Sequence, residues 1–104
     1  MAQLHEMAAG LFGNMVKGVV DVERGIVALD AELHADLEAL LLENGSSQRS
    51  LWGINLYPEL TGEAFLEFDA MINLRPSQGN RSRSVDDPAI RGQIAHIVGT
   101  RIVS

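Results

Sequence analysis

Residues 30–43, DAELHADLEALLLE, decide the fold, because they can be interpreted either as a helix or as a strand. Their composition favours a helix, since Ala, Glu and Leu are strong helix formers and an aspartate at the start is a candidate cap. Their periodicity favours a strand, because polar and apolar residues alternate strictly along most of the stretch. Asn44-Gly45 follows, a pair typical of a hairpin turn. We therefore predict a strand over residues 32–43 that pairs with residues 50–57 through this turn.

Three other segments carry strand patterns. Residues 16–29 are rich in β-branched side chains, and we interpret them as one strand with a bulge at Gly25. Residues 51–57 indicate a second strand, which ends at Pro58. From residue 64 to residue 75 apolar and polar side chains alternate cleanly, which predicts a strand with one face on a core.

Helices are predicted at both ends of the chain. In residues 2–15 apolar side chains recur at helical spacing. Near the other end, Asp87 is a candidate N-cap, Pro88 suits the first helical position, and an apolar stripe runs from Ile90 to Ile102. Successive strands with short turns favour an antiparallel meander. We predict one α+β domain over residues 1–104, an antiparallel four-stranded sheet with the N- and C-terminal helices packed on one face.

The composition bounds the class of protein. A chain of 104 residues with 46% hydrophobic and 21% charged residues is ordinary for one globular domain. It contains no cysteine, which excludes a disulfide framework, a zinc–thiolate site and a cysteine nucleophile. No apolar run approaches the roughly eighteen residues of a membrane span, and no stretch has the pattern of a signal peptide. We therefore expect a cytoplasmic protein without a membrane partner.

The distribution of charge singles out one basic segment. Residues 75–84 carry three of the eight basic residues and no acid, in a chain of net charge −6. The rest of the chain holds five basic and fourteen acidic residues, which argues against nucleic acid as a partner. Arginine forks suit phosphate or carboxylate oxygens, although these arginines could instead pair with acids of the same or a neighbouring subunit. The predicted anion-binding residues are Arg75, Ser77, Asn80, Arg81 and Arg83.

The predicted strand over residues 32–43 would place its polar side chains on one face of the sheet. Carboxylates beside a histidine are the groups used for metal binding and for acid–base catalysis. No spacing among them is diagnostic, so we predict no metal and no cofactor. A solvated face or a polar subunit interface is the favoured interpretation, and a catalytic site is the alternative. The catalytic candidates are His34 and Asp36. The same face is predicted to carry Glu32, Glu38, Asp69 and Asn73.

The strand predicted over residues 51–57 carries two aromatic residues of opposite parity. Trp52 and Tyr57 therefore face opposite sides of the sheet. We predict that one of them belongs to the core. For the pair, a role in core packing alone is the favoured interpretation, and a pocket or an interface lined by the other aromatic is the alternative. Asn55 or Tyr57 would then join the polar face.

Three strings in the chain are unusually specific. They are LHAD at residues 33–36, LWGINLYP at residues 51–58 and NLRPSQGNRSR at residues 73–83, with Asp86-Asp87-Pro88 close behind. Through them the chain resembles a small prokaryotic family of uncharacterised proteins, a domain of unknown function, over nearly its whole length. The resemblance implies a fold shared with the other members, and it brings no known activity, cofactor or catalytic residue.

Three functional hypotheses follow from these features. The first is a small cytoplasmic binding domain that holds a phosphate or carboxylate ligand with the loop of residues 75–83. The second is an enzyme in which His34 and Asp36 hydrolyse a phosphorylated substrate held by that loop. The third is a structural protein whose loop and polar face form a homo-oligomer interface, and a dimer is the expected assembly for so small a domain. Close approach of His34 or Asp36 to Arg75 or Arg81 in one cleft would favour the enzyme, and loop arginines paired across a symmetry axis would favour the structural protein.

Overall fold

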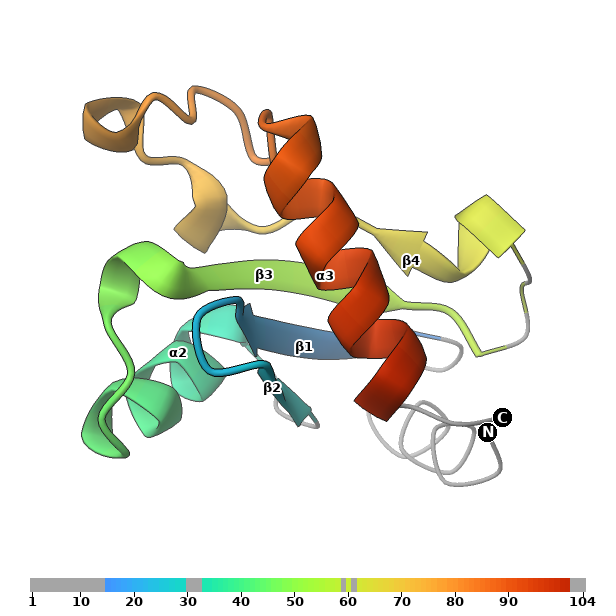
Figure 1. The fold of residues 1–104 in the computed structure, drawn as a ribbon, viewed down its shortest axis with the longest axis horizontal. Helices are drawn as coiled ribbons and strands as arrows, with labels where there is room; N and C mark the ends of the chain where they lie inside the picture. Colours follow the sequence, from blue (N-terminus) through green and yellow to red (C-terminus); the bar gives the residue numbers. More distant parts are fainter. Residues whose placement is uncertain (1–14, 30–32, 59, 61, 102–104) are drawn as a thin grey trace.

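The computed structural model describes residues 15–29, 33–58, 60 and 62–101. It contains an antiparallel sheet of four strands in the order β2-β1-β3-β4 (Figure 1). The strands are β1 (Val16–Asp21), β2 (Ile26–Leu29), β3 (Leu51–Leu56) and β4 (Leu66–Glu67), and the helices are α2 (His34–Glu43) and α3 (Pro88–Arg101). The α+β class and the four-stranded antiparallel sheet are confirmed. The strands do not form a simple meander, because α2 returns the chain from β2 to the other side of β1, where β3 pairs.

The strand predicted over residues 32–43 is wrong, because His34–Glu43 form α2; residues 30–32 lie outside the described part. Residues 51–56, which form β3, pair with β1 and not with residues 32–43 as predicted. The other side of β1 is occupied by β2. Leu37 and Leu41 lie one helical turn apart and are buried against the sheet, which fixes the helix although the sequence alternates. Asn44-Gly45 ends this helix, with Gly45 at φ +96°, so the pair is a helix terminus and not a hairpin turn.

The segment interpreted as one bulged strand is a hairpin of β1 and β2. Asp21 holds the turn: its buried carboxylate accepts the backbone N–H groups of Glu23 at 2.9 Å and Arg24 at 3.0 Å. Its other oxygen accepts the hydroxyl of Ser46 at 2.6 Å, which ties the turn to the end of α2. Gly25 closes the turn at φ +67°, a conformation that favours glycine.

The strand predicted over residues 64–75 is also shorter than expected, because β4 covers only Leu66–Glu67. Beyond Asp69 the chain leaves the strand path and forms a short 3₁₀ helix over Met71–Asn73. Beside Gly53, the buried side-chain amide of Asn73 takes the place of a longer β4: its Oδ1 accepts the N–H of Gly53 at 2.7 Å, and its Nδ2 donates to the carbonyl of Gly53 at 2.9 Å. The side chain of Asn73 thus pairs the backbone N–H and carbonyl of Gly53 on the edge of β3 that β4 does not cover. The alternation of residues 64–75 predicted a longer strand there and gave no sign of this side-chain pairing.

Two hydrophobic clusters occupy the two faces of the sheet. On one face α3 packs on a cluster that includes Val20 and Trp52, and in Figure 1 this helix crosses in front of β3 and β1. On the opposite face α2 packs on Val19 and Leu51. The predicted helix over residues 2–15 falls almost wholly outside the described residues, so its place on a face is not seen.

The C-terminal helix and the parity of β3 are as predicted. The Asp87 carboxylate caps α3 by accepting the N–H of Ala89 at 2.8 Å, and Pro88 is the first helical residue. Trp52 lies in the core on the α3 face, whereas Tyr57 points to the other side, where its hydroxyl donates to Glu67 at 2.8 Å. None of the helices within the described ranges is long and apolar enough to cross a membrane.

Candidate functional site

A row of polar side chains crosses the α2 face of the sheet. Lys17 on β1 is paired with Asn55 on β3, and Asn55 is paired with Glu67 on β4. Because side chains alternate along a strand, Lys17 has the same parity as buried Val19, and both lie on the face that α2 covers. The register therefore places a cation, an amide and a carboxylate side by side.

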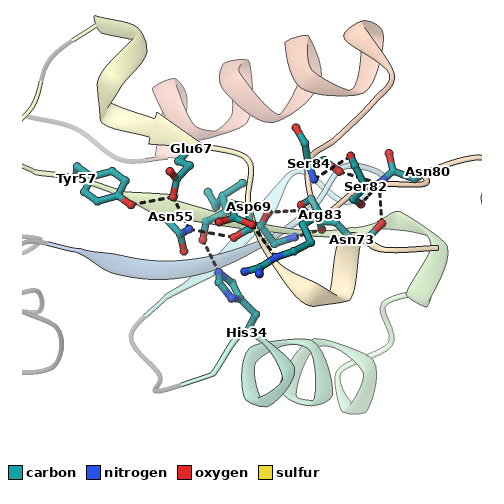
Figure 2. A network of polar contacts seen from close by, with 12 residues as sticks. His34, Asn55, Tyr57, Glu67, Asp69, Asn73, Asn80, Ser82, Arg83 and Ser84 are labelled. Atoms are coloured by element: carbon teal, nitrogen blue, oxygen red, sulfur yellow. Dashed lines mark hydrogen bonds and ion pairs between the residues drawn. The ribbon is translucent and has the colours of Figure 1, made fainter. Parts of the chain in front are cut away.

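A pocket of about 250 Å³ opens over this row, between the start of α2 and the segment that follows β4. We call it the His34 pocket. Figure 2 shows His34, Asn55, Asp69 and Arg83 gathered between α2 and the sheet. Its polar lining residues are Lys17, His34, Asn55, Asp69 and Arg83, and its other lining residues are Leu33, Ala35, Ala70, Met71 and Ile72.

Gly53 is the reason that the pocket wall can lie so close to the sheet. A Cβ built at Gly53 would overlap with Ala70 Cβ and would lie 3.2 Å from both His34 Cδ2 and Ile72 Cγ1. The absence of a side chain there lets the chain after β4 cross directly over β3. The crossing carries Asp69 and Ala70 over the sheet, and the Ala70 N–H donates to the carbonyl of Arg83 at 3.1 Å. Two stretches distant in sequence thus meet at the pocket.

His34 is the first residue of α2, and its ring is partly buried in the pocket wall. Nε2 lies 2.8 Å from the carbonyl oxygen of Ile54, and because a carbonyl only accepts, Nε2 carries the proton. Burial lowers the pKa of His34, an effect that the contact with the Ile54 carbonyl partly opposes and the nearby charge of Lys17 strengthens. The ring is therefore biased toward its neutral form, with Nδ1 as the basic nitrogen.

Asn55 sits at the centre of the row and is almost fully buried. Its Nδ2 donates to Glu67 Oε1 at 2.8 Å and to the carbonyl of Asp69 at 3.0 Å. Its Oδ1 lies beside the His34 ring, close enough to favour the protonated imidazole, yet within the described residues it accepts no hydrogen bond of ordinary geometry. The pocket thus contains a buried acceptor without a good donor, which is an uncommon state for a buried polar atom.

The acidic end of the row raises the pKa of Tyr57 to about 12. Desolvation is the largest cause, and the hydrogen bond from the hydroxyl to Glu67 and the charges of Glu67 and Asp69 add to it. Both carboxylates therefore act on the same region of the sheet face, and Tyr57 keeps its proton at physiological pH.

Arg83 supplies a positive charge at the mouth of the pocket. Its Nε lies 2.9 Å from Asp69 Oδ1, with the two side chains 56% and 45% exposed. Its backbone carbonyl accepts from Ala70 N–H and from Asn73 Nδ2 at 3.0 Å, so the residue is anchored through its main chain. An ion pair this exposed contributes little to stability, so a ligand could compete for the guanidinium.

The other arginines predicted to bind an anion point elsewhere. Arg75 lies 4.2 Å above the Trp52 ring and donates to the carbonyls of Gln48, at 2.6 Å, and Leu51. Burial lowers the pKa of Arg75, and the charge of Glu38 opposes this effect. Arg75 thus ties its loop to β3, and the loop does not gather its arginines into one cluster.

The remaining loop residues hold the loop in shape. The buried Asn80 amide donates to the carbonyls of Asn73 at 2.7 Å and Ser84 at 2.7 Å, and its Oδ1 accepts the N–H of Asp86 at 2.8 Å. Arg81 is exposed, and its backbone N–H donates to Asp86 at 2.9 Å. Ser77 and Asn80 line a second hollow of about 490 Å³, on the side of the loop that faces α3.

The predicted polar face is reduced by the helical fold of residues 34–43. Asp36 is exposed in the first turn of α2 and does not line the pocket, Glu38 lies near Arg75, and Glu32 is outside the described residues. Asn73 is buried and serves the backbone of β3. His34 therefore lines the same pocket as Arg83 and Asp69, whereas Arg75 and Arg81 do not line it.

Lys17 is the pocket residue that sequence reasoning missed. It lies inside a β-branched strand, and nothing in its local pattern marks it. Only the pairing of β1 with β3 places it beside Asn55, so the strand register would have been the signal. Among the residues that the structure describes, no group of three or more His, Cys, Asp and Glu could hold a metal ion.

Comparison with known proteins identifies the family. A family model described as "Protein of unknown function (DUF5674)" matches residues 1–101. The chain belongs to this family. The DUF5674 match confirms the resemblance to a domain of unknown function that the three sequence strings indicated. No curated protein and no solved structure matches the chain.

Proposed function

We propose that this DUF5674 domain binds a small ligand in the His34 pocket through an anionic group of the ligand, with Arg83 and Lys17 as the cationic groups. The observation that carries the proposal is that one pocket brings together Arg83 of the basic loop and His34 of the predicted polar face. A carboxylate or phosphate at the pocket mouth would take the Arg83 guanidinium from Asp69.

Of the three arginines predicted to bind an anion, only Arg83 lines the pocket. Arg75 already uses its guanidinium on Trp52 and two carbonyls, and Arg81 does not line the pocket. Nucleic acid does not suit this arrangement, because the few cations of a small pocket cannot follow a run of phosphates across an acidic surface.

Calorimetric titration with 4-methylpentanoate and with inorganic phosphate tests the proposal. We expect saturable binding of at least one of them, and a loss of tenfold or more in Arg83→Gln, because a charge-assisted hydrogen bond contributes roughly 1.5–3 kcal/mol. Arg81→Gln is the matched control, an exposed arginine two residues away, and it should bind as the unchanged protein does. An equal loss in the two variants would contradict the proposal, and so would the absence of binding of any small carboxylate or phosphate compound tested.

A catalytic role is the second candidate, and one observation favours it. The Ile54 carbonyl fixes the proton of His34 on Nε2, which leaves Nδ1 as a base in the same pocket as Arg83. The partner that sequence analysis gave His34, Asp36, does not line the pocket, so the base would act without that carboxylate. Turnover that disappears in His34→Gln while ligand affinity is retained would distinguish an enzyme from a binding domain.

A further inference from the structure

We infer that the ligand of the His34 pocket is amphoteric: a small amino acid with an apolar side chain, whose carboxylate binds Arg83 and whose ammonium binds Asp69. This inference rests on the proposed function and deepens it by naming the ligand class. Two independent features of the pocket support it: its Arg83–Asp69 ion pair and its apolar wall.

The Arg83–Asp69 ion pair favours a ligand that carries both a negative and a positive group. Arg83 and Asp69 are paired at 2.9 Å in the structure, so an anion that takes Arg83 leaves the Asp69 carboxylate without its cation. Glu67 lies on the same face, and Asn55 contacts both, through Glu67 Oε1 and the Asp69 carbonyl. A simple anion on Arg83 would leave Lys17 as the remaining cation of the lining, whereas a zwitterion also brings a cation for Asp69 to replace the one it removes.

The apolar wall calls for a hydrocarbon body of limited size. Leu33 is 56% exposed and Met71 is 63% exposed at the rim, and Ala70 and Ile72 continue the same wall inward. Large apolar side chains left exposed beside a polar pocket are typical of a binding surface. The volume of about 250 Å³ lies below the range of roughly 300–1,000 Å³ for drug-sized ligands, so a nucleotide would not fit inside.

Four probes separate the charge requirements: L-leucine, 4-methylpentanoate, which lacks the amine, 3-methylbutylamine, which lacks the carboxylate, and inorganic phosphate. We expect leucine to bind the full chain at least tenfold more tightly than each of the other three, by calorimetry at pH 7.5. Equal or tighter binding of 4-methylpentanoate or phosphate would overturn the amphoteric ligand and leave the proposed function standing. Binding of none of the four would overturn both.

A variant tests the role of Asp69 directly. Asp69→Asn should weaken leucine binding about tenfold and leave 4-methylpentanoate binding unchanged or tighter, because the repelling carboxylate is gone. Asp36→Asn, an exposed acid of α2 that does not line the pocket, is the matched control and should change neither affinity. Asp69 is 45% exposed, so the variant should fold, which circular dichroism checks. Retention of the full preference for leucine in Asp69→Asn would overturn the inference, and the probe series on the unchanged chain stands independently of this variant.

Discussion

Replacement of Gly53 by alanine should destabilise the protein, and replacement of Gly92 by alanine serves as its control. A Cβ would be crowded at Gly53, whereas it would meet open space at Gly92. A Cβ at Gly53 would overlap with Ala70 Cβ and press on His34 and Ile72 at 3.2 Å. The segment after β4 would have to move by about 1 Å to regain an ordinary carbon–carbon distance. Overpacking of this kind lowers the free energy of unfolding by about 1–3 kcal/mol.

Gly92 lies inside α3, and a Cβ there meets nothing within 4 Å. Gly92→Ala should therefore raise the free energy of unfolding by about 0.5–1 kcal/mol, the difference in helix propensity between the two residues. The same chemical change thus has opposite signs at the two positions. The pair distinguishes a close approach of two segments from a general effect of removing glycine.

Urea denaturation followed by tryptophan fluorescence measures both variants, since Trp52 is the single tryptophan and is buried in the core. We expect the urea midpoint to fall for Gly53→Ala and to rise for Gly92→Ala, with the slope unchanged. Gly53→Ala should also weaken ligand binding, because Ala70 and Ile72 line the pocket. A Gly53→Ala protein as stable as the unchanged chain would refute the crossing of residues 70–72 over β3.

Three further predictions concern single side chains. Asn73→Ala should lower the free energy of unfolding by about 3 kcal/mol in urea, because the N–H and C=O of Gly53 both lose their partner, at about 1–3 kcal/mol for each unsatisfied group; a loss under about 1 kcal/mol would show that water replaces the amide. Arg75→Ala should lower the free energy of unfolding by more than about 0.5 kcal/mol, because it removes the contacts with Trp52 and the Gln48 carbonyl. Arg81→Ala should change it by no more than about 0.5 kcal/mol, and equal changes in the two variants would contradict the assigned contacts. Burial lowers the pKa of His34 below its ordinary 6.5, so the unfolded chain takes up this proton at a higher pH than the folded chain. The free energy of unfolding should therefore fall as the pH drops through and below 6.5. His34→Gln should flatten that decline in urea denaturation between about pH 5 and 7.

The elements that local signals specify could be predicted from the sequence. The start of α3 follows from a cap and a proline at adjacent positions, and β3 ends where Pro58 cannot continue a ladder. The identity of residues 34–43 could not be settled locally, because alternation and helix propensity disagreed. The burial of Leu37 and Leu41 against Val19 and Leu51 decided it, and that is a tertiary contact.

The candidate site was predictable in its residue types and not in its grouping. His34, Asp69 and Arg83 each stood out as chemically suited to a site. Their meeting depends on the crossing of the chain over Gly53, where the amide side chain of Asn73 takes the partner position that a longer β4 would have filled. A pattern of polar and apolar residues does not encode such an exchange, so the predicted strand over residues 64–75 placed Asp69 and Asn73 together when their roles are separate.

The most direct test of the central claim is a ¹H–¹⁵N chemical-shift titration of the full chain with L-leucine. We expect saturable shifts concentrated at Lys17, Asn55, Asp69 and Arg83, around the His34 pocket. Shifts concentrated in residues 75–81, or no saturable shifts at all, would contradict it.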